Sequence, residues 1–290
     1  MSESRPTLEI RSFTREQIPD ALGFCAQVGW NHIAADWQRC LDLNSEGCIG
    51  GFLDGKLMAT STINRFGDFG WVGTFLVDES LRGKGCGKQM FEAVIAYGAS
   101  HGLGWLALDS TEAGRPIYLK YGFELTDDGN ELWGGPNGGS GDPDATPLVE
   151  SHWEALLAFD AEKSLIDRSA QLRHLAAEEG ASARVIERGG RIVAFGFSRP
   201  GKLAGAIGPV VAETDADALK IIAALRADRR AIDGERGVAL ALLDRASLKQ
   251  NLSKEGFQMR RRLLRMYYPE KRFQALNGAG VFVATGLGMG

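Results

Sequence analysis

The sequence predicts an α+β protein, with a mixed α/β sheet flanked by helices, built as two related domains in tandem. Three observations support this prediction. Apolar runs of strand character alternate with runs of helical period. A stretch rich in glycine and proline divides the chain near its middle, and short motifs of the first half recur in the second. At 290 residues, the chain also exceeds the usual size of one domain, about 100–200 residues.

The first elements are a strand and two helices. The run from Leu8 to Phe13 has strand character. The main helix after it begins near Pro19, because proline is accepted in the first turn of a helix, and it runs to Val28. A second helix is expected from Ile33 to Leu43.

A β-hairpin is predicted next. The apolar-rich runs Cys48–Leu53 and Lys56–Asn64 flank Asp54-Gly55. This dipeptide is favoured in tight hairpin turns because both central residues need a positive φ. The two runs are therefore expected to pair as antiparallel strands.

A strand, a glycine-rich loop and a helix follow the hairpin. Trp71 to Val77 is a nearly continuous apolar run suited to a buried strand, and the residues after Gly85 have helical period. Three further elements complete the first half: a strand from Trp105 to Leu108, a helix from Arg115 to Tyr121, and a strand from Phe123 onward.

The segment from Gly134 to Pro147 is too rich in glycine and proline for regular structure and is interpreted as a linker. The predicted domains are residues 1–134 and 148–290, joined by residues 135–147. The second half repeats motifs of the first at an offset of 134 or 135 residues. The paired motifs are Gly55-Lys56-Leu57-Met58-Ala59 with Gly190-Arg191-Ile192-Val193-Ala194, Tyr121-Gly122-Phe123 with Glu255-Gly256-Phe257, and Gly73 with Gly208.

Composition argues against several classes of function. A formal net charge of −4 gives no overall basic surface for nucleic acid or an anionic membrane. The one basic run, Arg260-Arg261-Arg262 with Arg265, is interleaved with apolar residues, as in a strand with a solvated face. The cysteines form no C-x-x-C pair and the histidines lie far apart, so no metal is expected. A polar N-terminus without a long apolar run predicts a cytoplasmic protein with reduced thiols, and an oligomer is not indicated.

The glycine-rich loop predicts a phosphate site. Arg82-Gly83-Lys84-Gly85-Cys86-Gly87 lies between a predicted strand and a predicted helix. Unpaired N–H groups and the helix dipole favour a diphosphate there, and glycines let it approach the backbone. The spacing fits neither the dinucleotide fingerprint G-x-G-x-x-G nor a P-loop, which disfavours nicotinamide and nucleoside-triphosphate enzymes.

Two ordered motifs in the first half resemble those of the GNAT acetyltransferase superfamily. Val72-Gly73-Thr74-Phe75-Leu76-Val77-Asp78 followed by Arg82-x-x-Gly85-x-Gly87 resembles its cofactor segment. The stretch Asp109 to Phe123 resembles the segment that carries a tyrosine four residues before a Gly-Phe pair. The resemblance covers Leu8 to Leu132, with the second half a weaker echo.

This resemblance implies that each domain is a twisted, mostly antiparallel sheet flanked by helices. Two strands of the first sheet splay apart and admit the pantetheine arm of acetyl-CoA like an extra strand. The residues implied to bind this cosubstrate are Phe75, Leu76, Val77, Arg82, Gly83, Lys84, Gly85, Cys86, Gly87, Lys88 and Thr111. Cys86 is interpreted as a small residue, because transfer in this family is usually direct and needs no acyl-cysteine.

Direct transfer needs a neutral amine, a stabilised oxyanion and a proton for the departing thiolate. The resemblance assigns the oxyanion to a backbone N–H near Leu76 or Val77 and the proton to Tyr118. Asp109, Glu112 and Glu79 are the candidate bases by proximity in the sequence, and the sequence does not choose among them.

The second half is interpreted as a degenerate GNAT-like domain without its own cofactor. Where the first half has its glycine loop, the second reads Val211 to Ala218 with three carboxylates, which would repel a diphosphate. The position of Tyr118 is taken by Leu252. This half either shapes the acceptor pocket across the interface or stabilises the first.

We therefore expect an enzyme, an N-acetyltransferase that uses acetyl-CoA, without a metal, to modify a primary amine. A small-molecule acceptor such as an amino sugar, a polyamine or an amino-acid derivative is the leading expectation, with neither nucleic acid nor a membrane as partner. A protein or peptide N-acetyltransferase and a non-catalytic acyl-CoA sensor remain as alternatives.

Overall fold

The computed structural model describes residues 5–243, 245–268, 280–286 and 288. Its strands are β1 Glu9–Ser12, β2 Cys48–Leu53, β3 Lys56–Phe66, β4 Phe69–Val77, β5 Trp105–Ser110, β6 Glu124–Gly135, β7 Thr146–Pro147, β8 Ser182–Arg188, β9 Arg191–Arg199, β10 Gly205–Ala212, β11 Val238–Leu243, β12 Gln258–Tyr268 and β13 Val281–Val283. Its α-helices are α1 Ile18–Gln27, α2 Ala34–Asn44, α3 Cys86–Ser100, α4 Arg115–Lys120, α5 Trp153–Ser164, α6 Ser169–Ala177, α7 Asp215–Asp233 and α8 Ala246–Lys254.

The elements predicted for the first half are confirmed, with ends that differ by a few residues. The hairpin turn lies at Asp54 and Gly55, whose φ values of 51° and 77° are both positive, as this turn requires. α1 begins one residue before Pro19, so that the missing N–H of proline costs no helical hydrogen bond. α3 begins directly after Gly85.

The predicted linker is only partly irregular. Gly134 and Gly135 belong to β6, Thr146 and Pro147 form β7, and residues 136–145 lie outside helices and strands. A side chain on Gly135 would overlap the ring of Phe257. Glycine therefore serves close packing at this strand end, and composition alone misread it as loop.

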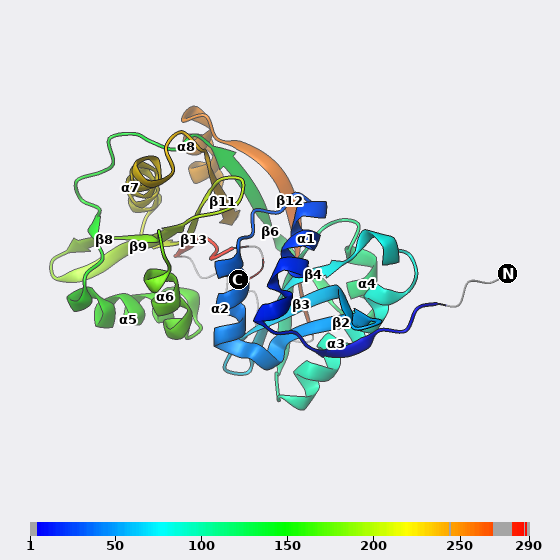
Figure 1. Cartoon of the computed structure of the whole chain (residues 1–290). Helices are drawn as coiled ribbons and strands as arrows, with labels where there is room; N and C mark the ends of the chain where they lie inside the picture. Colours follow the sequence, from blue (N-terminus) through cyan, green and yellow to red (C-terminus); the bar gives the residue numbers. More distant parts are fainter. Residues whose placement is uncertain (1–4, 244, 269–279, 287, 289–290) are drawn as a thin grey trace.

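A single sheet passes through both halves, where the sequence predicted a separate sheet for each. The strand order is β1-β2-β3-β4-β5-β12-β6-β11-β13-β10-β9-β8-β7, and the pairings are antiparallel except β4–β5 and β10–β11. β12 of the second half lies between β5 and β6, while β6 of the first half pairs with β11. In Figure 1 these two long strands, green and orange, run side by side between the halves.

Each face of the sheet is covered by helices. In the first half, α3 lies on one face, where the fully buried Met90, Phe91 and Val94 anchor it, each worth about 1.5–3 kcal/mol of apolar burial. α1 and α2 cover the opposite face around Trp37. The second half repeats this layering with α7 on one face and α5 and α6 on the other. Among the described residues, no helix has the length and apolar character needed to cross a membrane.

Candidate active site

The parallel strands β4 and β5 diverge near the middle of the first half. Residues 69–71 of β4 pair with residues 105–107 of β5, and no further pairing of the two strands follows within the described residues. β4 is distorted where they part, because Thr74 has a φ of 42°, which is unusual for a β-branched residue. Beyond it, Leu76 and Val77 pair with β3 alone, so the β5-facing edge of Phe75 to Val77 is open to an extended ligand.

The glycine loop leads from this opening into α3. Gly83 and Gly85 have φ values of 76° and 88°, a left-handed conformation that glycine adopts without strain. Gly85 is the N-cap and has no capping side chain, and the first turn of α3 carries no acidic residue. The first N–H groups of this helix of 15 residues therefore have no intrahelical partner, and its positive dipole end faces no carboxylate of its own.

The side chains of the loop are arranged unevenly. Arg82 is exposed, and its Nε donates to the carbonyl of Val77 at 3.0 Å, which ties the loop to the end of β4. Lys84 is exposed, and Lys88 lies 3.5 Å from Glu92 in a solvated ion pair. Burial raises the pKa of the Cys86 thiol, so this residue stays protonated and suits the packing role inferred for it.

Tyr118 lies in the core on the α3 side of the opening. Its ring contacts Phe75 at 6.0 Å and Phe91 at 4.9 Å between centroids, both edge to face. The hydroxyl makes no hydrogen bond to any residue that the structure describes, and desolvation raises the pKa of the phenol well above 10. A buried phenol of this kind keeps its proton and can donate it to a ligand.

Thr111 lies in the turn before α4, the helix that carries Tyr118. Its carbonyl accepts from Gly114 and Arg115 at 3.0 Å, and its hydroxyl accepts from Gly114 at 3.2 Å. A role in cofactor binding stays a prediction for Thr111, while its hydrogen bonds hold the turn that leads into α4.

The three candidate bases differ in their surroundings. The side chain of Asp109 is fully buried and bound by Arg265, with Nε 2.9 Å from Oδ1, while Asn130 donates to Oδ2 at 2.8 Å. Its oxygens are occupied, so Asp109 is better explained as one half of a structural ion pair than as a base. Glu112 forms a solvated pair with Arg115, and Glu79 is exposed; both remain predictions.

The buried position of Arg265 also corrects the interpretation of the basic run. β12 forms there as expected, and Arg260 and Arg262 are exposed. Arg265 is instead 5% exposed, with its guanidinium 4.9 Å from the ring centre of Trp71. The partner that explains it lies 156 residues away along the chain.

His32, which the sequence analysis did not select, lies near the distortion of β4. Its ring lies beside Trp30 and Trp37, and its Nδ1 is buried without a hydrogen-bond partner among the described residues. A Cβ built on Gly288 would lie 3.7 Å from both His32 Nε2 and the backbone nitrogen of Thr74. Desolvation lowers the pKa of His32 below 6.5. The charge of Asp36 raises this pKa, and the charges of Arg199 and Arg39 lower it further, so the imidazole is neutral at pH 7.

The matching positions of the second half are built differently. Thr214 caps α7 by accepting from Asp217 N–H at 3.1 Å, and the carboxylate of Asp217 is paired with Arg188. This helix start is therefore closed by its own side chains. Leu252, the counterpart of Tyr118, is fully buried on α8 and offers no proton.

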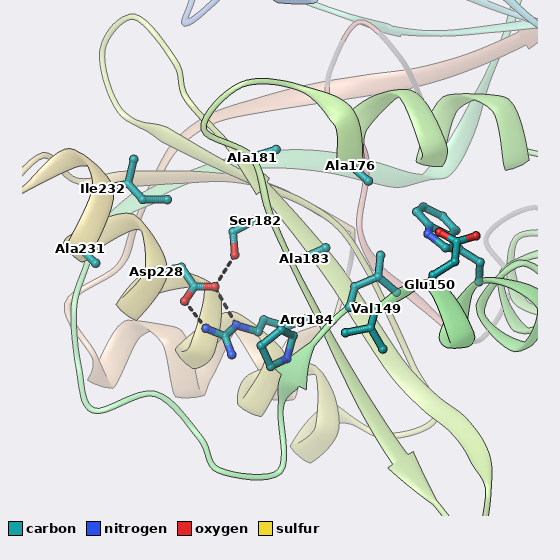
Figure 2. A pocket seen from close by; sticks show the side chains of 13 residues that line it. Val149, Glu150, Ala176, Ala181, Ser182, Ala183, Arg184, Asp228, Ala231 and Ile232 are labelled. Atoms are coloured by element: carbon teal, nitrogen blue, oxygen red, sulfur yellow. Dashed lines mark hydrogen bonds and ion pairs between the residues drawn. The ribbon is translucent and has the colours of Figure 1, made fainter.

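A pocket of about 580 Å³ lies in the second half, between β8 and the end of α7, with part of α6 and the β7 region. Figure 2 shows Arg184 and Asp228 paired at its wall, with Ser182 donating to the same carboxylate. None of the predicted site residues lines it. Among the described residues, no group of three or more histidine, cysteine, aspartate or glutamate side chains could hold a metal ion.

Comparison with known families gives a match in each half. Residues 12–123 match the family described as "Acetyltransferase (GNAT) family", and residues 156–279 match the one described as "Acetyltransferase (GNAT) domain". A comparison with curated protein sequences finds no match.

Solved structures share the fold over nearly the whole chain. A putative acetyltransferase from Pyrococcus horikoshii is 18% identical, with a TM-score of 0.76, and the match covers 98% of this chain and 96% of that one. A GCN5-related N-acetyltransferase from Sphaerobacter thermophilus is 15% identical, with a TM-score of 0.64 over 90% and 95% of the two chains. A tandem GNAT protein from the clavulanic acid biosynthesis pathway is 14% identical, with a TM-score of 0.65 over 91% and 100%.

Proposed function

Because both halves of the chain belong to the GNAT acetyltransferases, we propose that its first half transfers an acetyl group from acetyl-CoA to a primary amine of a small molecule. One observation carries the proposal. The opening between β4 and β5 ends at a glycine loop and an uncapped helix start, which together fit a long ligand with a diphosphate. The family shows that the chain is an acyltransferase. The identity of its two substrates is what we propose.

Acetyl-CoA is the cosubstrate whose shape fits this surface. Its pantetheine arm would pair with the open edge of Phe75 to Val77, and its diphosphate would accept from the N–H groups at the start of α3. Lys84 and Lys88, both exposed beside that helix start, supply positive charge. The first turn of α3 carries no carboxylate that would repel an anion, which supports binding of the diphosphate there.

The chemistry is direct attack of the amine nitrogen on the thioester carbon. The C–N bond forms, the C–S bond breaks, and the thiolate takes the proton of Tyr118, while the amine proton passes to a base. The raised pKa of Tyr118 does not oppose this step, because the same desolvation raises the proton affinity of a buried thiolate. N–H groups near Leu76 and Val77 would stabilise the oxyanion.

We assign the base to His32. It is a neutral imidazole, and a Cβ built on Gly288 would lie 3.7 Å from both its Nε2 and the backbone nitrogen of Thr74. The carboxylate of Asp109, in contrast, is bound by Arg265. A neutral imidazole accepts a proton at pH 7, whereas both oxygens of Asp109 already accept hydrogen bonds, from Arg265 and Asn130.

A small acceptor is favoured over a protein because the second half lies against the face from which the amine would arrive. Ile166 packs against the cluster of Phe69 and Trp71 on that face. An extended peptide would need this face to be open.

The proposal is tested by incubating the protein with acetyl-CoA and glucosamine, spermidine, an amino-acid amide or a peptide with a free N-terminus. Acetylated product is measured by mass spectrometry. We expect transfer to at least one small amine, lost in Gly85→Glu. Gly102→Glu is the matched control. Gly102 also has a positive φ, it follows the far end of α3, and no atom of the described residues lies within 4 Å of its Cβ position.

Transfer to the peptide alone would favour the protein acetyltransferase. Binding of acetyl-CoA without transfer to any of the four probes would contradict an enzymatic first half of this specificity and favour the sensor.

A further inference from the structure

The second half has its own opening between parallel strands, and a strand of the chain fills it. β10 and β11 pair only from Gly205 to Ile207 in the described residues, just as β4 and β5 pair only at their beginning. β13 then lies between them, with Val283 opposite both Val210 of β10 and Leu242 of β11. Its neighbours extend the pairing, since Ala212 donates to Gly280 at 2.9 Å and Ala284 donates to Ala241 at 2.8 Å.

The chain that leaves β13 crosses to the first half. A side chain on Gly208 would overlap the carbonyl oxygen of Ala284, and one on Gly73, its counterpart, would overlap the carbonyl oxygen of Gly288. One segment therefore lies against the equivalent glycine of both halves. Asn64 also donates to the Gly288 carbonyl at 3.0 Å.

Residues between these two points are fixed at the interface. The carbonyl of Thr285 accepts from Arg199 at 3.1 Å, and Arg199 also donates to Asp36 of α2 at 3.1 Å. The Thr285 hydroxyl lies 3.4 Å from both Arg168 and Gln171. The C-terminal segment, here residues 284–286 and 288, is thus held by the second half and delivered to β4.

We propose that β13 occupies in the second half the place that the pantetheine arm takes in the first, and that the C-terminal segment forms the acceptor-side wall of the first active site. This inference rests on the proposed function. The wall contains Gly288, Asn64 and His32, beside the distortion at Thr74. Since β13 fills the second opening, the chain binds one acetyl-CoA. Through the wall, the second half contributes to the selection of the acceptor amine.

Two variants test the wall without removing β13. In the first, the chain ends after Gly286, which removes Gly288 and keeps Thr285. In the second, Gly73→Ala places a methyl group against the Gly288 carbonyl. Gly70→Ala is the matched control. It adds a methyl group to the same strand, but on the opposite face, where the new Cβ meets Leu103 and Leu106.

For the amine that the wild type acetylates, we expect both variants to raise KM at least tenfold or to change the order of preferred amines. The affinity for acetyl-CoA, measured by calorimetry, should stay within about threefold, with one site per chain in every protein that binds. Gly70→Ala should keep the wild-type KM. Unchanged KM and preference in both variants would overturn the wall, and two sites per wild-type chain would overturn the role of β13.

The proposed function fails differently. If the wild-type protein binds no acetyl-CoA, or transfers to no amine, the proposed function is wrong, and the acceptor wall is rejected with it. A wild type that transfers normally, with variants that match it, leaves the activity intact and rejects only the inference.

Discussion

Tyr118 is the residue on which the proposed chemistry depends most. Tyr118→Phe removes the proton donor and leaves the ring, which packs against Phe75 and Phe91. We expect kcat to fall about 100-fold, within the usual range for a lost general acid, with the affinity for acetyl-CoA nearly unchanged. Steady-state kinetics and calorimetry measure the two quantities. A kcat within threefold of the wild type would remove Tyr118 as the acid.

His32 gives a prediction about pH. Desolvation lowers its pKa below 6.5, so it loses its basic form only when the pH falls through that lowered value. Wild-type kcat should therefore fall in acid with a midpoint below 6.5, and His32→Gln should lower kcat at pH 7 about 100-fold and remove that midpoint. His101→Gln is the control, since that imidazole also lies beside an aromatic ring, Tyr97, in the same half. An unchanged pH profile in His32→Gln would leave His32 a packing role.

Local motifs revealed some site residues and long-range contacts decided others. Gly85 and Tyr118 lie in short patterns that require strand, loop and helix in sequence, so their positions followed from the chain itself. The ion pair of Asp109 with Arg265 joins residues 156 apart, and His32 approaches β4 through folding alone. The motif therefore did not reveal that Asp109 is held in an ion pair, and it did not point to His32, the base proposed here.

At the scale of elements, α2 carries ion pairs that join the halves. Arg39 of α2 is fully buried, 2.6 Å from Asp36 and paired with Glu178 of the second half. Burial alone would raise the pKa of Asp36, but Arg199 and Arg39 hold it well below its usual value. The stability that this group contributes is present above its unfolded pKa and is lost as the pH falls through the folded one.

Arg39→Ala would leave Asp36 and Glu178 short of a partner in a buried site. We expect a loss of about 3–5 kcal/mol in the free energy of unfolding at pH 7, measured by urea denaturation. Arg15→Ala is the control. It removes an exposed ion pair with Asp42 of α2, the helix that also carries Arg39, and should cost about 1 kcal/mol or less. Equal losses in the two variants would show that the buried network contributes little.

At the scale of the whole molecule, the exchange of long strands makes the halves depend on each other. Neither the repeat nor the linker composition indicated it, because an apolar strand pattern does not specify which strand lies beside it. β12 separates β5 from β6, so a fragment of residues 1–147 lacks a strand in the middle of its sheet. The two domains found in the sequence are thus repeats, but they share one sheet.

We therefore expect residues 1–147 and 148–290, produced separately, to show little cooperative unfolding and no acetyl-CoA binding. Co-expression should restore both properties in a one-to-one complex seen by size-exclusion chromatography. A fragment of residues 1–147 that unfolds cooperatively as a monomer and binds acetyl-CoA would refute this dependence.

Hydrogen exchange of the whole protein, followed by mass spectrometry with and without acetyl-CoA, tests most directly where the cosubstrate binds. We expect slower exchange in peptides covering residues 74–90, where β4 ends and α3 begins, and no change in the equivalent residues 209–225. Slower exchange at residues 209–225 alone, or no change anywhere at a saturating acetyl-CoA concentration, would contradict a cofactor site in the first half.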